Sequence, residues 1–157
     1  MNLRGITSAC LGMLVLTACA PVIMTVASIT IPKSLYFNPV KGPILDQYPN
    51  TVVNGSASGL SSGSISLKLP TGETCKGEWA TIPQTQAEMD LSSYWDLVYG
   101  QGYFTKNIQG VRDRAKAKMT GEKGTVILAE FYRRTEHEAT FQGVAKDSVG
   151  NVYKVTN

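Results

Sequence analysis

Residues 64–69, SISLKL, and residues 74–79, TCKGEW, decide the fold of this chain. In both stretches apolar or small residues alternate with polar ones, which is the period-two pattern of a strand with one buried face. Turn-forming residues at 70–73, PTGE, join the two. The sequence therefore predicts a β-hairpin over about 64–82. Its core side is expected to carry Ile65, Leu67, Leu69, Cys75 and Trp79.

The C-terminal third continues the same pattern. Ala115, Ala117 and Met119 alternate with polar residues, a turn follows at 121–124, and a long apolar strand spans 125–134. Two more strands are expected after it, one with Phe141, Gly143 and Ala145 on one face and one over 152–156. Turns about every 8–12 residues are typical of a small barrel or sandwich. We predict an all-β fold, a small antiparallel meander that forms a barrel or a sandwich and ends on a strand that closes the sheet.

One segment has helical spacing. Apolar residues recur three and four apart over 84–103, after Thr85 as a cap and Glu88 three residues later. We expect one short helix or lid near 85–99. Its aromatic residues suit either a ligand site or a lid packed over a sheet, and we favour the lid. They are Trp95, Tyr99, Tyr103 and Phe104.

The N-terminal segment has the parts of an export signal. Arg4 precedes an apolar run from about Ile6 to Leu16, which ends in Leu16-Thr17-Ala18-Cys19. This ending resembles the lipobox of bacterial lipoproteins. The resemblance implies that residues 1–18 are a signal peptide, that Cys19 is the lipidation site, and that it carries diacylglycerol and an N-acyl chain. No other cofactor is expected.

Two other interpretations of this segment remain open. One is an ordinary secretory signal, and the other is an uncleaved transmembrane helix, because no charged residue lies between Arg4 and Lys33. Pro21 argues against the helix, since it would remove a backbone hydrogen bond in the middle of the run. Ala20 follows the expected anchor. In the lipobox family this implies an outer-membrane location, with the domain facing the periplasm.

Domain organisation is expected to be simple. Residues 19–50 have a proline every few positions, which predicts a Pro-rich tether, and the lipobox resemblance implies that this segment begins with the lipidated Cys19. The tether is apolar, so part of it is expected to pack on the domain as an edge strand or a strap. Residues 51–157 are then a single β-domain.

The chain also resembles a group of small, uncharacterised Gram-negative envelope lipoproteins. The resemblance lies in turn-and-strand patterns at 72–79, 124–131, 143–147 and 150–153. It implies a second cysteine near Ala129 as a partner for Cys75, which this chain lacks. Cys10 leaves with the signal and Cys19 is the anchor, so we expect Cys75 to be a small buried side chain rather than a disulfide partner. No activity follows from this group.

Catalytic patterns are weak. A metal site or a nucleophile with a histidine base would depend on His137, the one histidine of the chain, and we predict neither. Sugar cleavage needs two acids at a set separation, and their positions along the chain do not establish it. We predict that the protein is not an enzyme. The candidate acids beside aromatic residues are Glu73, Glu78, Glu88, Asp90 and Asp96.

Basic residues gather after position 110, although the net charge of the whole chain is only +3. If the strands pair as predicted, several of them share one outward face that binds anionic headgroups or an acidic envelope protein. We favour the simpler interpretation, an ordinary solvated strand face. Nucleic acid is not an expected partner, because the chain has no aromatic and basic stacking motif. The candidate residues are Arg114, Lys116, Lys118, Arg133 and Arg134.

Three functions are consistent with these features. We prefer an outer-membrane lipoprotein with a non-catalytic structural or interaction role at the cell envelope, attached to the membrane through its lipid. The alternative is a carrier of small ligands or lipids, whose barrel interior is lined by Trp79 and Trp95. An envelope hydrolase is the third.

Overall fold

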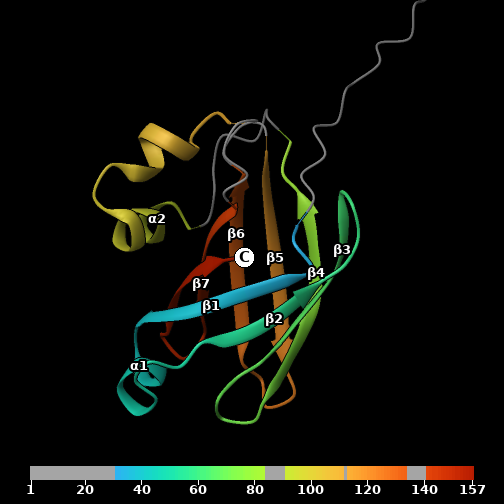
Figure 1. The fold of residues 1–157 in the computed structure, drawn as a ribbon, viewed down its shortest axis with the longest axis vertical. Helices are drawn as coiled ribbons and strands as arrows, with labels where there is room; N and C mark the ends of the chain where they lie inside the picture. The colour runs from blue at the N-terminus through green and yellow to red at the C-terminus, as the bar shows by residue number, and fades with distance from the viewer. Residues whose placement is uncertain (1–30, 84–90, 112, 134–140) are drawn as a thin grey trace, which may run out of the picture.

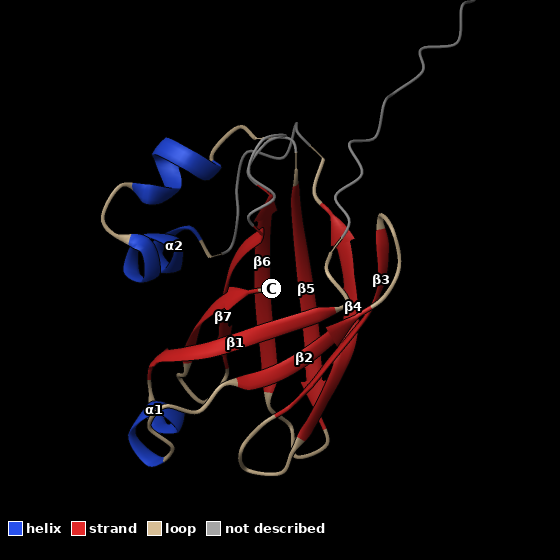
Figure 2. Cartoon of the chain, in the orientation of Figure 1, coloured by secondary structure: helices blue, strands red, loops and turns tan. Residues whose placement is uncertain are grey.

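The computed structural model describes residues 31–83, 91–111, 113–133 and 141–157. Eight antiparallel strands follow one another around a closed barrel, in which β1 also pairs with β8 (Figure 1). Two short α-helices, α1 and α2, and one π-helix, η1, are added to it (Figure 2). The strands are β1 (Ser34–Lys41), β2 (Val53–Ala57), β3 (Ser62–Lys68), β4 (Thr74–Thr81), β5 (Arg114–Gly121), β6 (Val126–Arg133), β7 (Phe141–Asp147) and β8 (Val152–Thr156). The helices are α1 (Pro43–Gln47), α2 (Ser92–Tyr99) and η1 (Phe104–Ile108).

The predicted all-β fold is confirmed, and the barrel is the form it takes. The hairpin expected over 64–82 is β3 paired with β4, in a register that places Leu67 opposite Cys75. Ile65, Cys75 and Trp79 are buried in the core, as the alternation predicts. The C-terminal meander is β5 to β8, and its last strand closes the sheet against β1.

The expected domain boundary at residue 51 is wrong, because β1 lies in the stretch assigned to the tether. Leu35 and Phe37 of β1 are fully buried in the barrel core, while Tyr36 between them is exposed. Pro39 lies where the pairing of β1 with β8 shifts register, and such irregularities tolerate a proline in a sheet. The prolines therefore do not prevent this segment from forming a strand.

Side chains fill the barrel interior. Bulky residues alternate around the wall with small ones, which allows a narrow barrel to pack without a large central space. The inward-facing residues form one continuous cluster that includes Phe37, Ile65, Trp79, Met119, Phe131, Phe141 and Tyr153. Trp95 is not among them. It lies outside the wall, in a second cluster with Leu91, Ile108, Tyr132 and Val144. Trp95 therefore does not line the interior, as the carrier alternative supposed, and packs in the lid that we favoured.

Within the described residues, α2 covers the C-terminal part of the segment predicted to be helical. α2 ends at Gly100, whose N–H donates to the Asp96 carbonyl at 2.9 Å, and η1 follows after a turn. Together they lie against the outside of the barrel wall near β7, which is the lid that we expected (Figure 1). The cap proposed at Thr85 and Glu88 falls outside the described residues.

A buried carboxylate organises the turn between β5 and β6. Glu73 Oε2 accepts a hydrogen bond from the Thr125 hydroxyl at 2.8 Å, and its Oε1 accepts one from the Lys123 N–H at 2.8 Å. The Thr125 hydroxyl is the main cause of a Glu73 pKa below its ordinary value of 4.5, and backbone N–H groups add to it while burial opposes it. The ionised carboxylate thus links the β3–β4 turn to the β5–β6 turn.

Cys75 lies beside this carboxylate and is completely buried, as the sequence predicts. Burial raises its pKa to about 11, and the charges of Glu73 and Asp147 act in the same direction. The thiol is therefore neutral near pH 7 and packs as an apolar side chain.

Gly77 is expected to tolerate no side chain. A Cβ at this position would collide with the Lys118 carbonyl oxygen and stand 2.7 Å from Cα of Met119 on the paired strand. We predict that Gly77→Ala lowers the free energy of unfolding by about 3 kcal/mol, measured by urea denaturation. Gly72→Ala is the control, because Gly72 has open space around it and only a positive φ to strain, at a cost of about 1 kcal/mol. Equal costs at the two positions would contradict the close approach.

Glu73 is expected to make the free energy of unfolding depend on pH. Because its pKa is lowered in the folded state, its contribution is present above the ordinary value of 4.5 and is lost as the pH falls through the lowered one. We expect Glu73→Gln to be less stable than the natural chain near pH 7, with a difference that shrinks toward pH 3. Urea unfolding across that range measures it, with the exposed Glu122→Gln as control. A difference that does not change with pH would refute this role.

Candidate functional site

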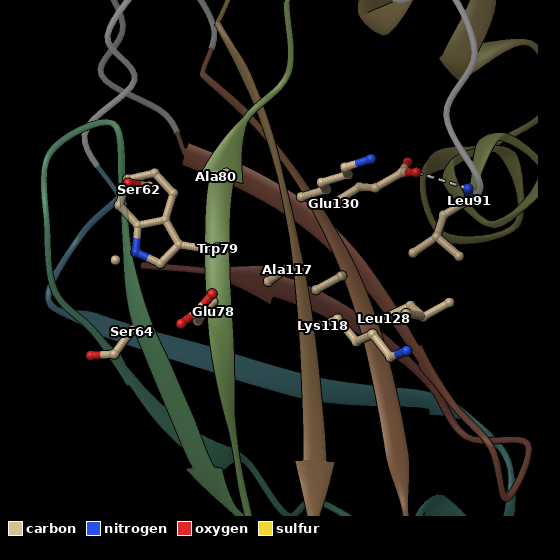
Figure 3. Close-up of a pocket in the computed structure, with 13 residues that line it drawn as sticks. Ser62, Ser64, Glu78, Trp79, Ala80, Leu91, Ala117, Lys118, Leu128 and Glu130 are labelled. Carbon is tan, nitrogen blue, oxygen red and sulfur yellow. Dashed lines mark hydrogen bonds between the residues drawn. The ribbon is translucent and has the colours of Figure 1, made fainter.

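A groove of about 630 Å³ lies along the outer side of β3, β4, β5 and β6. Figure 3 shows Glu78, Lys118 and Leu128 along this wall, with Leu91 beside Glu130 at the lid. Its volume falls in the range of about 300–1,000 Å³ that is usual for small-molecule sites. The groove is lined by Ser62, Gly63, Ser64, Glu78, Trp79, Ala80, Leu91, Lys116, Ala117, Lys118, Leu128, Ala129 and Glu130.

Strand register sets the pattern of charge in the groove. Lys118 of β5 lies between Glu78 of β4 and Leu128 of β6. Lys116 lies between Ala80 of β4 and Glu130 of β6. Directly opposed residues on one face of an antiparallel pair have Cβ atoms about 4.5–5.5 Å apart. Each lysine therefore has one acidic and one apolar neighbour.

Glu130 connects the groove to the lid. The side chain faces outward from β6 and is nevertheless buried. Its Oε1 accepts a hydrogen bond from the Leu91 N–H at 2.9 Å, and its Oε2 accepts one from the Trp95 indole N–H at 3.0 Å. Leu91 directly precedes α2, so the negative charge lies at the helix end that favours it.

Stacked aromatic side chains attach the rest of the lid to the wall. The ring centroids of Trp95 and Tyr99 are 5.5 Å apart, and those of Tyr99 and Tyr103 are 4.8 Å apart. The Tyr99 hydroxyl donates to the Gly143 carbonyl of β7 at 3.2 Å, and the Tyr103 hydroxyl donates to the Gln142 side chain. Burial raises the Tyr99 pKa above its ordinary value. The aromatic residues singled out from the sequence thus pack as a lid.

Arg114 does not belong to an exposed basic face. Its side chain is completely buried, and desolvation lowers its pKa while the nearby charge of Glu130 opposes that shift. The guanidinium contributes to the charge balance under the lid. The sequence could not indicate this, because strand alternation places Arg114 on the outward side of β5 and does not show which outward residues are covered.

The other predicted basic residues separate into two groups. Lys116 and Lys118 are exposed in the groove. Arg133 is exposed too, but it is two residues after the inward-facing Phe131 and pairs with Phe141. It therefore belongs to the same face of β6 as Phe131, which is opposite to the face of Glu130. Arg134 falls outside the described residues. The five predicted positions therefore do not form a single basic face. Of these residues, Lys116 and Lys118 line the groove.

The candidate acids do not gather as the sequence allowed. Glu78 lies in the groove with Glu130, whose carboxylate already accepts two N–H groups. Glu73 belongs to the turn at the other end of β4, and Asp96 accepts a hydrogen bond from the Phe104 N–H at 2.8 Å. Glu88, Asp90 and His137 fall outside the described residues. Within the described part of the chain, no group of three or more metal-ligating side chains is formed.

The predicted lipidation site lies elsewhere in the chain. Leu16, Thr17, Ala18 and Cys19 all fall outside the described residues. In the ranges that the structure does describe, none of the helices is both long enough and apolar enough to cross a bilayer.

Comparison with known proteins identifies no relative. A scan of protein-family models, a search of curated proteins and a search of solved structures each find no match.

Glu130 is expected to hold the lid in place. In Glu130→Ala the buried N–H groups of Leu91 and Trp95 lose their acceptor, and we predict a loss of about 2–3 kcal/mol in the free energy of unfolding. Amide hydrogen exchange over 91–99 should rise while β4 stays protected. The exposed Glu78→Ala in the same groove is the matched control and should change neither quantity. Unchanged exchange in the lid of Glu130→Ala would contradict this role.

Proposed function

We propose that this protein is a lipoprotein anchored in the outer membrane through Cys19, with a non-catalytic structural or interaction role at the cell envelope. The observation that carries the proposal is the segment Leu16-Thr17-Ala18-Cys19 at the end of an apolar run. Two acyl chains give stable attachment, because each buried CH₂ contributes about 0.8 kcal/mol and one chain alone binds only marginally. The protein part then has no need to insert.

The start of the barrel is compatible with an anchor close to the membrane. Ile31 is already buried in the barrel core. The chain from Cys19 to Ile31 spans at most about 40 Å when fully extended. The proposed anchor would thus keep the domain within that distance of the lipid surface and limit its partners to those at the same membrane.

The filled interior supports an interaction role over an internal carrier. Trp79, Phe131 and Tyr153 occupy the space that a ligand would need. The groove carboxylate of Glu130 is engaged by N–H groups, which makes it a poor general acid for hydrolysis. Both arguments favour a role that depends on the outer surface.

The intact mass of the detergent-extracted protein tests the anchor. We expect a chain that begins at Cys19 and carries added acyl mass, and we expect Cys19→Ser to lose that mass and leave the membrane fraction. Cys10→Ser is the matched control, since Cys10 lies within the expected signal, and it should be processed normally. A full-length unmodified mass, or a cleaved Cys19→Ser product that stays tightly bound to the membrane, would refute the proposal.

Separation of inner and outer membranes tests the location independently. The natural chain is expected in the outer-membrane fraction, and protease added to intact cells should not reach it if the domain faces the periplasm. Recovery of the lipidated chain in the inner membrane would refute the location while leaving the anchor in place.

A further inference from the structure

We propose that the groove on the outer side of β3–β6 binds a single-chain anionic amphiphile, with the anionic group at Lys116 and the apolar chain along Leu128 and the methylene stems of the groove lysines. This site is separate from the lipid on Cys19, and the inference does not depend on the anchor.

The two groove lysines differ in how far their charge is balanced. Lys118 lies opposite Glu78, an exposed carboxylate that is available to neutralise it. Lys116 lies opposite Ala80 on one side and Glu130 on the other. The oxygens of Glu130 accept the N–H groups of Leu91 and Trp95, and the charge of the buried Arg114 also acts on Glu130. Lys116 therefore retains the stronger positive field.

Lys116 is also exposed and ready to bind. Within the described residues, its ammonium group has neither an ion pair nor a hydrogen bond. A carboxylate or phosphate monoester that enters the groove would form a charge-assisted hydrogen bond with it without breaking an existing one. This charge complementarity is why we assign the anionic end of the ligand to Lys116.

The remainder of the groove suits an apolar chain. Ala80 is small and leaves room on the outer wall, while the partly buried Leu128 provides apolar surface. The methylene groups of the two lysines extend that surface, because such side chains cover apolar surfaces while their charged ends stay in water. An ion without an apolar part would use only one portion of the site.

Strand pairing argues against an extended peptide as the occupant. Each of β3, β4, β5 and β6 pairs with a neighbour on both sides. The groove thus has no open strand edge to which a peptide could add its backbone hydrogen bonds. Recognition must depend on side chains, which favours a small ligand with one charged end.

Nuclear magnetic resonance of the isotopically labelled full chain in nanodiscs of neutral phosphatidylcholine tests the site. The probes are octanoate and octyl phosphate, and octanol and acetate are the controls that lack the charge or the chain. Empty nanodiscs correct for probe that partitions into the bilayer. We expect both anionic probes to cause saturable amide shifts confined to groove residues, with weaker binding of octanol and none of acetate.

Substitutions of single lysines test which of them binds the anionic group of the probe. Lys116→Met keeps the apolar stem and is expected to weaken octanoate binding by about fivefold. Lys118→Met should have a smaller effect, and Lys76→Met, an exposed lysine on β4 outside the groove, should have none. Comparable losses in Lys116→Met and Lys76→Met, equal binding of octanol and octanoate, or shifts outside the groove would overturn the proposal. Binding by octanoate but not by octyl phosphate would restrict the ligand to carboxylates.

Discussion

The pairing of β1 with β8 is the constraint on which the rest of this structure depends. An open sheet of this length would leave unpaired N–H and C=O groups along two edges, and closure removes both. Closure also forces alternate side chains of every strand into one small interior. Leu35 and Phe37 from β1 complete that interior, so the first strand contributes both hydrogen bonds and core volume.

A barrel that is filled in this way leaves its described cavities on the outside of the wall. Phe131 and Tyr153 occupy the interior, whereas the outer faces of β3–β6 carry small and charged residues that leave a groove. The groove and the lid meet at Glu130. This carboxylate receives N–H groups from Leu91 and Trp95 and lies close to the charge of Arg114. A buried charge is tolerated only with such partners, because desolvation without them would be costly.

Most of the sheet could be predicted from sequence, because period-two alternation reports directly on a wall with one buried face. The hairpin around Cys75 and the β5–β8 meander follow that rule, and their inward residues were predicted correctly. β1 was assigned to a Pro-rich tether, part of which was expected to pack as an edge strand or a strap, but the sequence did not show that this segment closes the barrel against β8. Alternation also cannot show which outward residues another element covers. For this reason Arg114 was counted in an exposed basic face, whereas its side chain is buried.

The same limit explains why the groove was not evident from sequence. Its distinctive feature is an inequality between Lys116 and Lys118, which are two positions apart and have the same outward direction. The sequence of β5 alone does not show that their charged neighbours differ. The difference comes from the strands on either side, since Glu78 remains exposed opposite Lys118 while Glu130 opposite Lys116 is drawn into the lid. The lid holds Glu130 through two N–H groups, and the charge of Arg114 acts on the same carboxylate. The field at Lys116 therefore depends on groups that the alternation of β5 does not show.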